Sequence, residues 1–443
     1  MLPPLKGEFH MIFLRRWQMA NGHVQTETFK LEKQRNKPSF LRAIEGDLPA
    51  ILSAYLLNLV YPTTKTLANT NVFEHSGKFY TIDENHLPQE IDILTLETLG
   101  HWDANGARNR PFTSQPKKVP GTGELVMIGV DAVKPFLELG IISADGMKLV
   151  HKVDLKFNRT SLCHDIGITQ RQITDLIHIF FFLVHVIMDF PLTVDINRLI
   201  VEACELIKYE KEGYARIGVM PRYGNANSIE WFEVEPSIVV LWACRARGSI
   251  IPGPDLGLNK FEWFSRGFKP LNSAEENNDS LAQDSLLFWR CYEWRLNMKT
   301  GEVKGMNLTG TESSMDFPII NENFTGLKNK YGYTQVVDSI VSSTSGMAKF
   351  GGLAKREEFI KVEYHKFEEN TFCFGAAFLP KHEGGEEDDG WIITFVHNEH
   401  TDTSFVYIID AKKFCSEPVA KITLPSKVPY GFHGAFMSRP LRH

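Results

Sequence analysis

Short runs of alternating apolar and polar residues, each following a tight turn, dominate this sequence. The clearest are 75–83 (HSGKFYTID), 121–131 (GTGELVMIGVD), 388–397 (DDGWIITFVH) and 403–411 (TSFVYIIDA). A period of two after a Gly, Asp or Ser turn is typical of half-buried strands in antiparallel sheets. Long helical periodicity is scarce, since even 131–139 (DAVKPFLEL) is interrupted by a proline. The pattern predicts an all-β protein.

Many short strands spread over 443 residues favour a β-propeller over a sandwich, because radial repetition protects the edges of the sheets. No repeat of the WD or kelch kind is visible. No linker divides the chain, so we expect one domain over residues 1–443. The polar stretch 272–284 and the acidic loop 383–389 are predicted to be surface connections. Calcium binding by the acidic loop is an alternative, but the loop lacks the spacing of an EF-hand.

Composition excludes several classes of function. The chain has 48 Lys and Arg against 54 Asp and Glu, with no long basic block, so nothing favours a nucleic-acid partner. Its six cysteines have no CxxC spacing, which indicates reduced thiols rather than a disulfide framework. The longest apolar stretch, 176–188, is shorter than the roughly 20 residues that a membrane-spanning helix needs. No targeting peptide is visible, so plastid and cytosol are both open.

Two histidines stand in segments that read as the ends of strands. They are His164, in SLCHDIGIT, and His433, in VPYGFHGAF. A rigid strand can aim a side chain, and neutral imidazole is a good ligand for iron, copper and zinc. The alternative for each is an ordinary packed histidine. Cys163 beside His164 is not expected to form a nucleophile–base pair, because neighbours on a strand point to opposite faces.

The motifs around these histidines carry a resemblance. TGELVMIGVD, HDIGIT, WFEVEP, YEWRLNMKTG and VPYGFHG follow one another along the chain. In this order they resemble the carotenoid cleavage dioxygenase family, particularly its plant members. The resemblance implies a seven-bladed β-propeller with Fe(II) on its axis, held by four histidines that glutamates orient. It also implies that O₂ and a carotenoid or apocarotenoid react, so that a polyene double bond is split into two carbonyl products.

The implied ligand set is incomplete in this chain. The first ligand position, in PFTSQPKKVPGTGEL, is occupied by Gln115, and an amide oxygen is a poorer partner for Fe(II) than imidazole. WFEVEP runs directly into SIVVLW, so the segment of the third ligand is missing near 236–238. His164 and His433 remain as the second and fourth ligands.

Other departures concern the supporting residues and the scaffold. Glu293 matches one orienting glutamate, while Gly375 falls where many relatives carry another. Residues 171–185 (RQITDLIHIFFFLVH) are an apparent insertion, similar to a translated pyrimidine tract before a splice acceptor. His178 and His185 within it are a disfavoured alternative as substitute ligands. The N-terminus begins late, so the propeller is expected to be incomplete there, with exposed sheet edges.

Two functional hypotheses follow. The first is a non-haem Fe(II) dioxygenase of the carotenoid cleavage family, impaired in this chain, with His164, His433 and Gln115 at the metal and Glu293 as the supporting catalytic-site residue. Changing even a residue that orients a ligand typically costs about 10–100-fold in metal affinity or activity. The second is an inactive relative that binds a polyene, or a mis-spliced gene product. Peripheral membrane contact is left open.

Overall fold

The computed structural model describes most of the chain in separate stretches. They are residues 9–14, 19–37, 39–40, 70–83, 86–108, 110–131, 137–161, 163–175, 178–189, 192–195, 207–209, 216–232, 238–246, 260–271, 285–297, 302–357, 361–381 and 384–437. The predicted connection 272–284 and part of the predicted deletion at 236–238 lie outside them. The chain divides into unit 1 (Met1–Ile168, Phe182–Glu230 and Met437–His443) and unit 2 (Thr169–Phe181 and Trp231–Phe436). The single domain over 1–443 stays a prediction.

Unit 1 is mostly β, as the alternation predicts. Its strands form two four-stranded antiparallel sheets, β3-β4-β5-β6 and β10-β9-β8-β7, with smaller pairs beside them. The elements are β1 (Phe9–Leu14), β2 (Met19–His23), α1 (Glu27–Arg35), β3 (Asn71–His75), β4 (Lys78–Ile82), β5 (Gln89–Ile91), β6 (Thr98–His101), β7 (Lys117–Lys118), β8 (Leu125–Val130), β9 (Leu137–Ile142), β10 (Leu149–Asp154), β13 (Leu192–Val194), β14 (Ile207–Tyr209), β15 (Arg216–Pro221) and the 3-10 helix η1 (Ala226–Ser228).

The hairpin of β3 and β4 illustrates how the sequence sets these strands. Ser76 and Gly77 form the connecting turn, and their φ angles are 54° and 78°. Two successive positive φ values give a turn whose twist matches that of the strands, which is why glycine suits this place. His75 then pairs with Lys78. The strand predicted after the turn in 75–83 is confirmed as β4.

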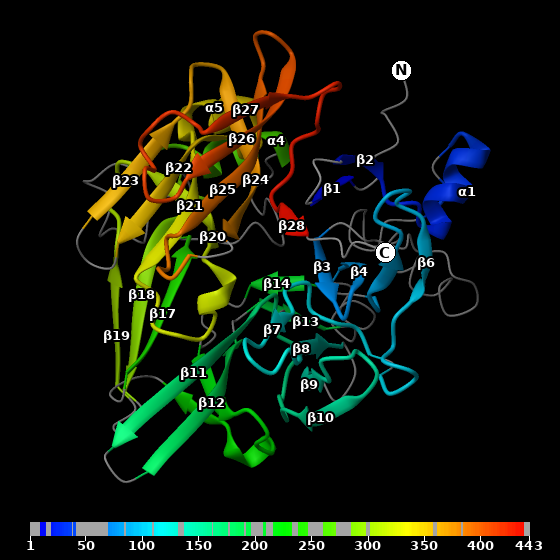
Figure 1. Ribbon diagram of the computed structural model, residues 1–443, viewed down its shortest axis with the longest axis vertical. Helices are drawn as coiled ribbons and strands as arrows, with labels where there is room; N and C mark the ends of the chain where they lie inside the picture. The colour runs from blue at the N-terminus through cyan, green and yellow to red at the C-terminus, as the bar shows by residue number, and fades with distance from the viewer. Residues whose placement is uncertain are drawn as a thin grey trace. The chain divides into compact units, whose positions relative to one another are not determined.

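Unit 2 is built around the strands that Figure 1 shows from yellow to red. They form an eight-stranded sheet in the order β20-β21-β22-β24-β25-β26-β27, with β23 paired to β22. The elements are β17 (Ile238–Arg245), α4 (Lys260–Gly267), β18 (Arg290–Asn297), β19 (Val303–Asn307), β20 (Ser314–Ile319), η3 (Glu322–Phe324), β21 (Tyr331–Val337), α5 (Ser339–Ser345), β22 (Phe350–Glu357), β23 (Lys361–Lys366), β24 (Thr371–Pro380), β25 (Gly390–Asn398), β26 (Thr403–Asp410) and β27 (Ala420–Thr423).

This large sheet consists of two smaller ones. Strands β22 and β24 pair only at Phe350 and Cys373. On either side of that pair lies a four-stranded antiparallel meander, β20–β23 and β24–β27. The first and second meanders share a core of buried apolar side chains that includes Tyr333, Ile392 and Phe414. A four-stranded meander is the unit from which propeller blades are made.

Four strands contain the boundary between the two units. They are β11 (Ile166–Asp175), β12 (His178–Asp189), β16 (Glu230–Phe232) and β28 (Ala435–Met437). The first three join β15 in a four-stranded sheet of order β11-β12-β15-β16, and β28 joins the sheet β2-β1-β28. The apparent insertion 171–185 therefore contributes to strands β11 and β12. In the described register, Val184–Asp189 of β12 pairs with β15. That these residues are an insertion stays a prediction.

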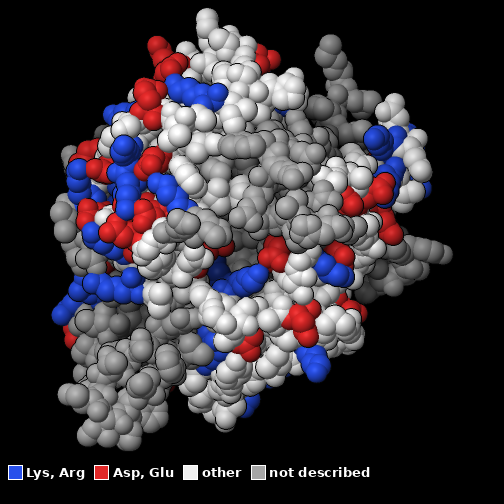
Figure 2. Space-filling model, viewed as in Figure 1, with Lys and Arg blue, Asp and Glu red and all other residues white. Residues whose placement is uncertain are grey.

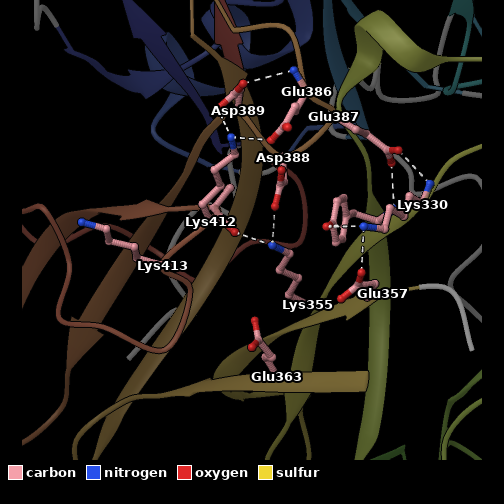
Figure 3. A network of polar contacts seen from close by, with 12 residues as sticks. Lys330, Lys355, Glu357, Glu363, Glu386, Glu387, Asp388, Asp389, Lys412 and Lys413 are labelled. Atoms are coloured by element: carbon pink, nitrogen blue, oxygen red, sulfur yellow. Dashed lines mark hydrogen bonds and ion pairs between the residues drawn. The ribbon is translucent and has the colours of Figure 1, made fainter. Parts of the chain in front are cut away.

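The acidic loop departs from its prediction as a solvated turn (Figure 3). Asp388 is buried and forms a 2.8 Å ion pair with Lys355. Glu387 is also buried, and its carboxylate accepts hydrogen bonds from the backbone N–H groups of Lys330 and Tyr331. Lys412 pairs with Asp389 at 2.6 Å. The surface prediction is wrong for Glu387 and Asp388, because β21, β22 and the residue before β21 supply their partners, whereas Glu386 is exposed and Asp389 partly so. Among the described residues no oxygen cluster that could hold Ca²⁺ is present.

Candidate metal centre

Unit 1 brings Gln115 and His164 close together along the backbone. Gln115 forms an isolated parallel β-bridge with Asp165, the residue after His164. Lys117 holds the same Asp165 through a 2.8 Å ion pair. Strand β11 then begins at Ile166, so His164 lies directly before a strand, as predicted. Two of the four implied ligand positions are therefore neighbours in this unit.

The side chain of Gln115 is oriented by a neighbouring amide. Asn71 donates from its Nδ2 to the Oε1 of Gln115 at 3.1 Å and to the carbonyl oxygen of Ser114 at 2.8 Å. The Nε2 of Gln115 is buried and has no hydrogen-bond partner among the described residues. The carbonyl end of the amide, which is the end that could touch a metal, is thus already used as an acceptor.

Unit 2 positions His433 through contacts on several sides. Gln335, buried in β21, donates from its Nε2 to the carbonyl oxygen of Phe432 at 3.1 Å. The ring of Phe317 stacks on that of Phe432 at 5.3 Å and meets the imidazole of His433 edge-on at 5.1 Å. His433 lies just before β28, at a strand end as predicted. Both His164 and His433 are exposed.

Phe317 reaches this position through an unusual backbone conformation. Its φ angle is 55°, a value that is rare for a bulky residue and that costs conformational energy. The register between β20 and β21 shifts between Asp316 and Ile319, so Phe317 lies in a bulge. Bulges of this kind redirect a side chain, and here the redirected ring contacts His433. No signal in the sequence identifies Phe317 or Gln335 as supports of this histidine.

Gly375 contacts the backbone of the His433 segment directly. Its φ is +63°, and a Cβ atom there would lie 2.8 Å from the carbonyl oxygen of His433. A Cβ on Gly434 would lie 2.2 Å from the carbonyl oxygen of Gly375. The two glycines therefore allow β24 and the His433 segment to approach one another closely. The position where many relatives are expected to carry a glutamate has no room for any side chain in this chain.

Glu293, the implied orienting carboxylate, is fully buried in β18. Its Oε2 accepts a 2.7 Å hydrogen bond from the Nε1 of Trp242, which lies directly opposite on β17. Its Oε1 accepts a 2.5 Å charge-assisted bond from the Nε of Arg295. Glu293 and Arg295 also line a hollow of about 680 Å³, together with residues of β19. Both carboxylate oxygens are engaged by these partners, and neither contact is to a histidine.

The disfavoured substitute ligand His185 is a core residue. It is fully buried, and its Nε2 is 3.0 Å from the carbonyl oxygen of Arg222. Burial lowers the pKa of its imidazole to about 4, so the ring is neutral at pH 7. Its Nδ1 has no hydrogen-bond partner among the described residues. The side chain of His178 lies outside the described residues.

The donor set of the described residues does not fit an iron held by four histidines. Unit 1 offers His164 and Gln115, whose backbones are neighbours through the bridge of Gln115 to Asp165, and unit 2 offers the imidazole of His433 and the engaged carboxylate of Glu293. In the described part of the chain, no group of three or more His, Cys, Asp and Glu side chains could hold a metal ion. Between His185 and His365 the sequence contains no histidine at all.

Comparison with known proteins decides the family. The model of the RPE65 family (retinal pigment epithelial membrane protein) matches residues 6–438. The carotenoid 9,10(9',10')-cleavage dioxygenase 1 of Pisum sativum is 30% identical, over 94% of this chain and 76% of that protein. The chain belongs to the carotenoid cleavage dioxygenase family. This family of enzymes uses a non-haem iron.

Solved structures agree on the fold of this family member. The lignostilbene dioxygenase of Pseudomonas brassicacearum has a TM-score of 0.73 at 20% identity, covering 94% of this chain and 83% of that one. The cobalt-substituted apocarotenoid oxygenase of Synechocystis has a TM-score of 0.72 at 18% identity, covering 95% and 84%. At these identities the likeness establishes the fold alone.

Among the described residues on the face in Figure 2, acidic and basic side chains are interspersed, without a continuous basic patch. None of the described helices is long and apolar enough to cross a membrane.

Proposed function

We propose that this chain is an impaired carotenoid cleavage dioxygenase. In the reaction of its family, O₂ splits a double bond of a carotenoid or apocarotenoid oxidatively, and the products are carbonyl compounds. In this chain, Fe(II) would be held weakly, by His164 and His433 as the remaining imidazole ligands and Gln115 as a poor third donor. The iron, when bound, supplies the activation of O₂, and the protein's task is to hold the iron and the polyene.

The arrangement of strands supports a seven-bladed propeller as the scaffold. When the eight-stranded sheet is counted as its two meanders, the described strands form seven sheets of three or four strands, and β13 and β14 form a further sheet of two. The sheets are β2-β1-β28, β3–β6, β7–β10, β11-β12-β15-β16, β17–β19, β20–β23 and β24–β27. Short antiparallel sheets of this size, repeated along the chain, are characteristic of propellers.

The observation that carries the proposed impairment is the environment of Glu293. An orienting carboxylate works by accepting the N–H of a ligating imidazole. Here Trp242 and Arg295 occupy both oxygens of Glu293. The amide of Gln115, likewise, already accepts a hydrogen bond from Asn71. The supporting groups of the implied site therefore serve the protein's own packing rather than ligands.

The proposal is tested by measuring bound iron per chain and product formed from a carotenoid. We expect the chain to bind Fe(II) poorly and to give little product. His433→Ala should reduce the residual iron further, whereas His400→Ala, in an exposed turn, should not. Gln115→His alone should restore little, because only three imidazoles would then be present. Gln115→His combined with the missing segment inserted after Pro236 should recover both iron and activity.

The outcomes separate the two functional hypotheses. Rapid turnover by the unaltered chain would refute the proposal, since it would require a complete ligand set. Failure of the combined restoration to bind iron would favour an inactive polyene-binding relative. In that case, quenching of tryptophan fluorescence by an apocarotenoid should be the same with and without added Fe(II).

A further inference from the structure

Two cysteines of unit 2 lie directly opposite one another in neighbouring strands. Cys244 of β17 pairs with Cys291 of β18 in the antiparallel register. Both are free thiols, Cys291 buried and Cys244 partly exposed. The two thiols perturb each other, since the neighbouring sulfur is the main cause that raises the pKa of Cys244 and lowers that of Cys291. Both side chains pack on the same apolar cluster, where Cys291 Sγ is 4.0 Å from Met315 Sδ.

The backbone of Cys291 identifies the type of this pair. Its carbonyl oxygen accepts from the N–H of Leu308 at 2.7 Å, and its own N–H donates to Thr309 Oγ1 at 3.1 Å. Both groups thus point toward the β19 side and away from β17. Cys244 and Cys291 are therefore a non-hydrogen-bonded pair, the kind in which opposite Cα atoms are only about 4.5 Å apart.

This separation lies within the range of about 4.4–6.8 Å that a disulfide bond spans. We propose that Cys244 and Cys291 form a reversible disulfide, making this strand pair a redox-sensitive site. The oxidant is a peroxide: the two thiols give up two protons and two electrons, the S–S bond forms, and hydrogen peroxide becomes two molecules of water. In a reducing compartment, disulfides that do form are usually transient and regulatory.

A disulfide between Cys244 and Cys291 would lie next to Glu293 of the candidate site. Along β17 and β18 the next pair on the same sheet face is Trp242 and Glu293, because residues two apart on a strand face the same side. A cross-link at Cys244 and Cys291 fixes the two strands against each other beside that pair. Oxidation therefore fixes the strands that carry Glu293 and its indole partner, independently of whether iron is bound.

The other described cysteines supply internal controls. Cys373 is fully buried and lies opposite Val396 on β25, and opposite Phe350 on β22. Cys415 is exposed. Neither is paired in register with a cysteine, so a peroxide that acts only by exposure would modify Cys415 first. A peroxide that acts through the strand pair would link Cys244 to Cys291.

The test uses the full chain with one equivalent of hydrogen peroxide, followed by maleimide blocking and tryptic digestion without reductant. We expect a linked species of peptides 223–245 and 291–295, two fewer maleimide adducts per chain, and reversal by dithiothreitol. Cys244→Ser should abolish the linked species and Cys373→Ser should retain it. Because Cys244 is partly exposed, its variant should fold even if Cys291→Ser does not.

Two results would overturn the proposal. The first is complete maleimide labelling of peptide 291–295 after peroxide treatment. The second is cross-linking of Cys291 to Cys163 or Cys415 as often as to Cys244, which would indicate random oxidation of an opened chain.

Discussion

Replacing Gly375 with alanine should destabilise unit 2 strongly. The new Cβ would lie 2.8 Å from the carbonyl oxygen and 3.0 Å from the carbonyl carbon of His433, which are backbone atoms that cannot rotate away. The φ of +63° adds about 1–2 kcal/mol for a residue with a Cβ. Forcing the two backbones apart adds about 1–3 kcal/mol. We therefore expect a loss of about 2–5 kcal/mol in the free energy of unfolding.

Urea unfolding and calorimetry of the variant measure this loss. For a unit of this size each kcal/mol lowers Tm by about 2–4 °C, so a decrease of about 4–20 °C is expected. Gly385→Ala is the matched control, because nothing lies within 4 Å of its Cβ position and its φ is not in the left-handed region. Its effect should stay within about 0.5 kcal/mol. If both variants are equally stable, β24 and the His433 segment do not approach as closely as described.

Two further predictions concern buried charge. The unfolded chain binds a proton at His185 below about pH 6.5 but the folded chain only below about pH 4, so the free energy of unfolding should decrease by roughly 3 kcal/mol as pH falls through this window. Urea unfolding between pH 7 and pH 4 measures this. The variant His185→Gln, whose amide can still donate to the carbonyl oxygen of Arg222, should remove much of the decrease. If its free energy of unfolding depends on pH as in the unaltered chain, His185 is not the group responsible. Lys355→Met should cost about 3–5 kcal/mol, because it leaves Asp388 buried without its partner. The double variant Lys355→Met with Asp388→Leu should recover most of this loss. The control Lys361→Met, at an exposed ion pair, should have no measurable effect. Equal losses of stability for Lys355→Met and Lys361→Met would refute the argument.

The strands could be predicted from the sequence because each carries its own signal. The runs at 121–131, 388–397 and 403–411 alternate along their length, and they form β8, β25 and β26. The turn at Ser76 and Gly77 is equally local. Such features depend on a few adjacent residues, so no knowledge of distant partners is needed.

The supports of the candidate site could not be predicted, because they depend on distant partners. Trp242 reaches Glu293 only through the register of β17 on β18, which is 51 residues away in the chain. Phe317 contacts His433 only because a bulge turns its ring. The burial of Asp388 likewise depends on Lys355 from another strand. A run of acidic residues therefore predicts a solvent-exposed loop unless the lysine that pairs with it is known.

The meander order of unit 2 has a consequence for how the protein folds. From β20 to β27 nearly every strand pairs with its predecessor in the chain, so each addition closes a short loop at small entropic cost. The His433 segment is different, since its hydrogen bond from Gln335 to Phe432 joins residues 97 positions apart. The His433 segment can pack in place only after β20, β21 and β24, which it contacts, have formed. Contacts of long sequence separation slow folding, so the histidine that would hold iron is placed late, on a sheet that is already formed.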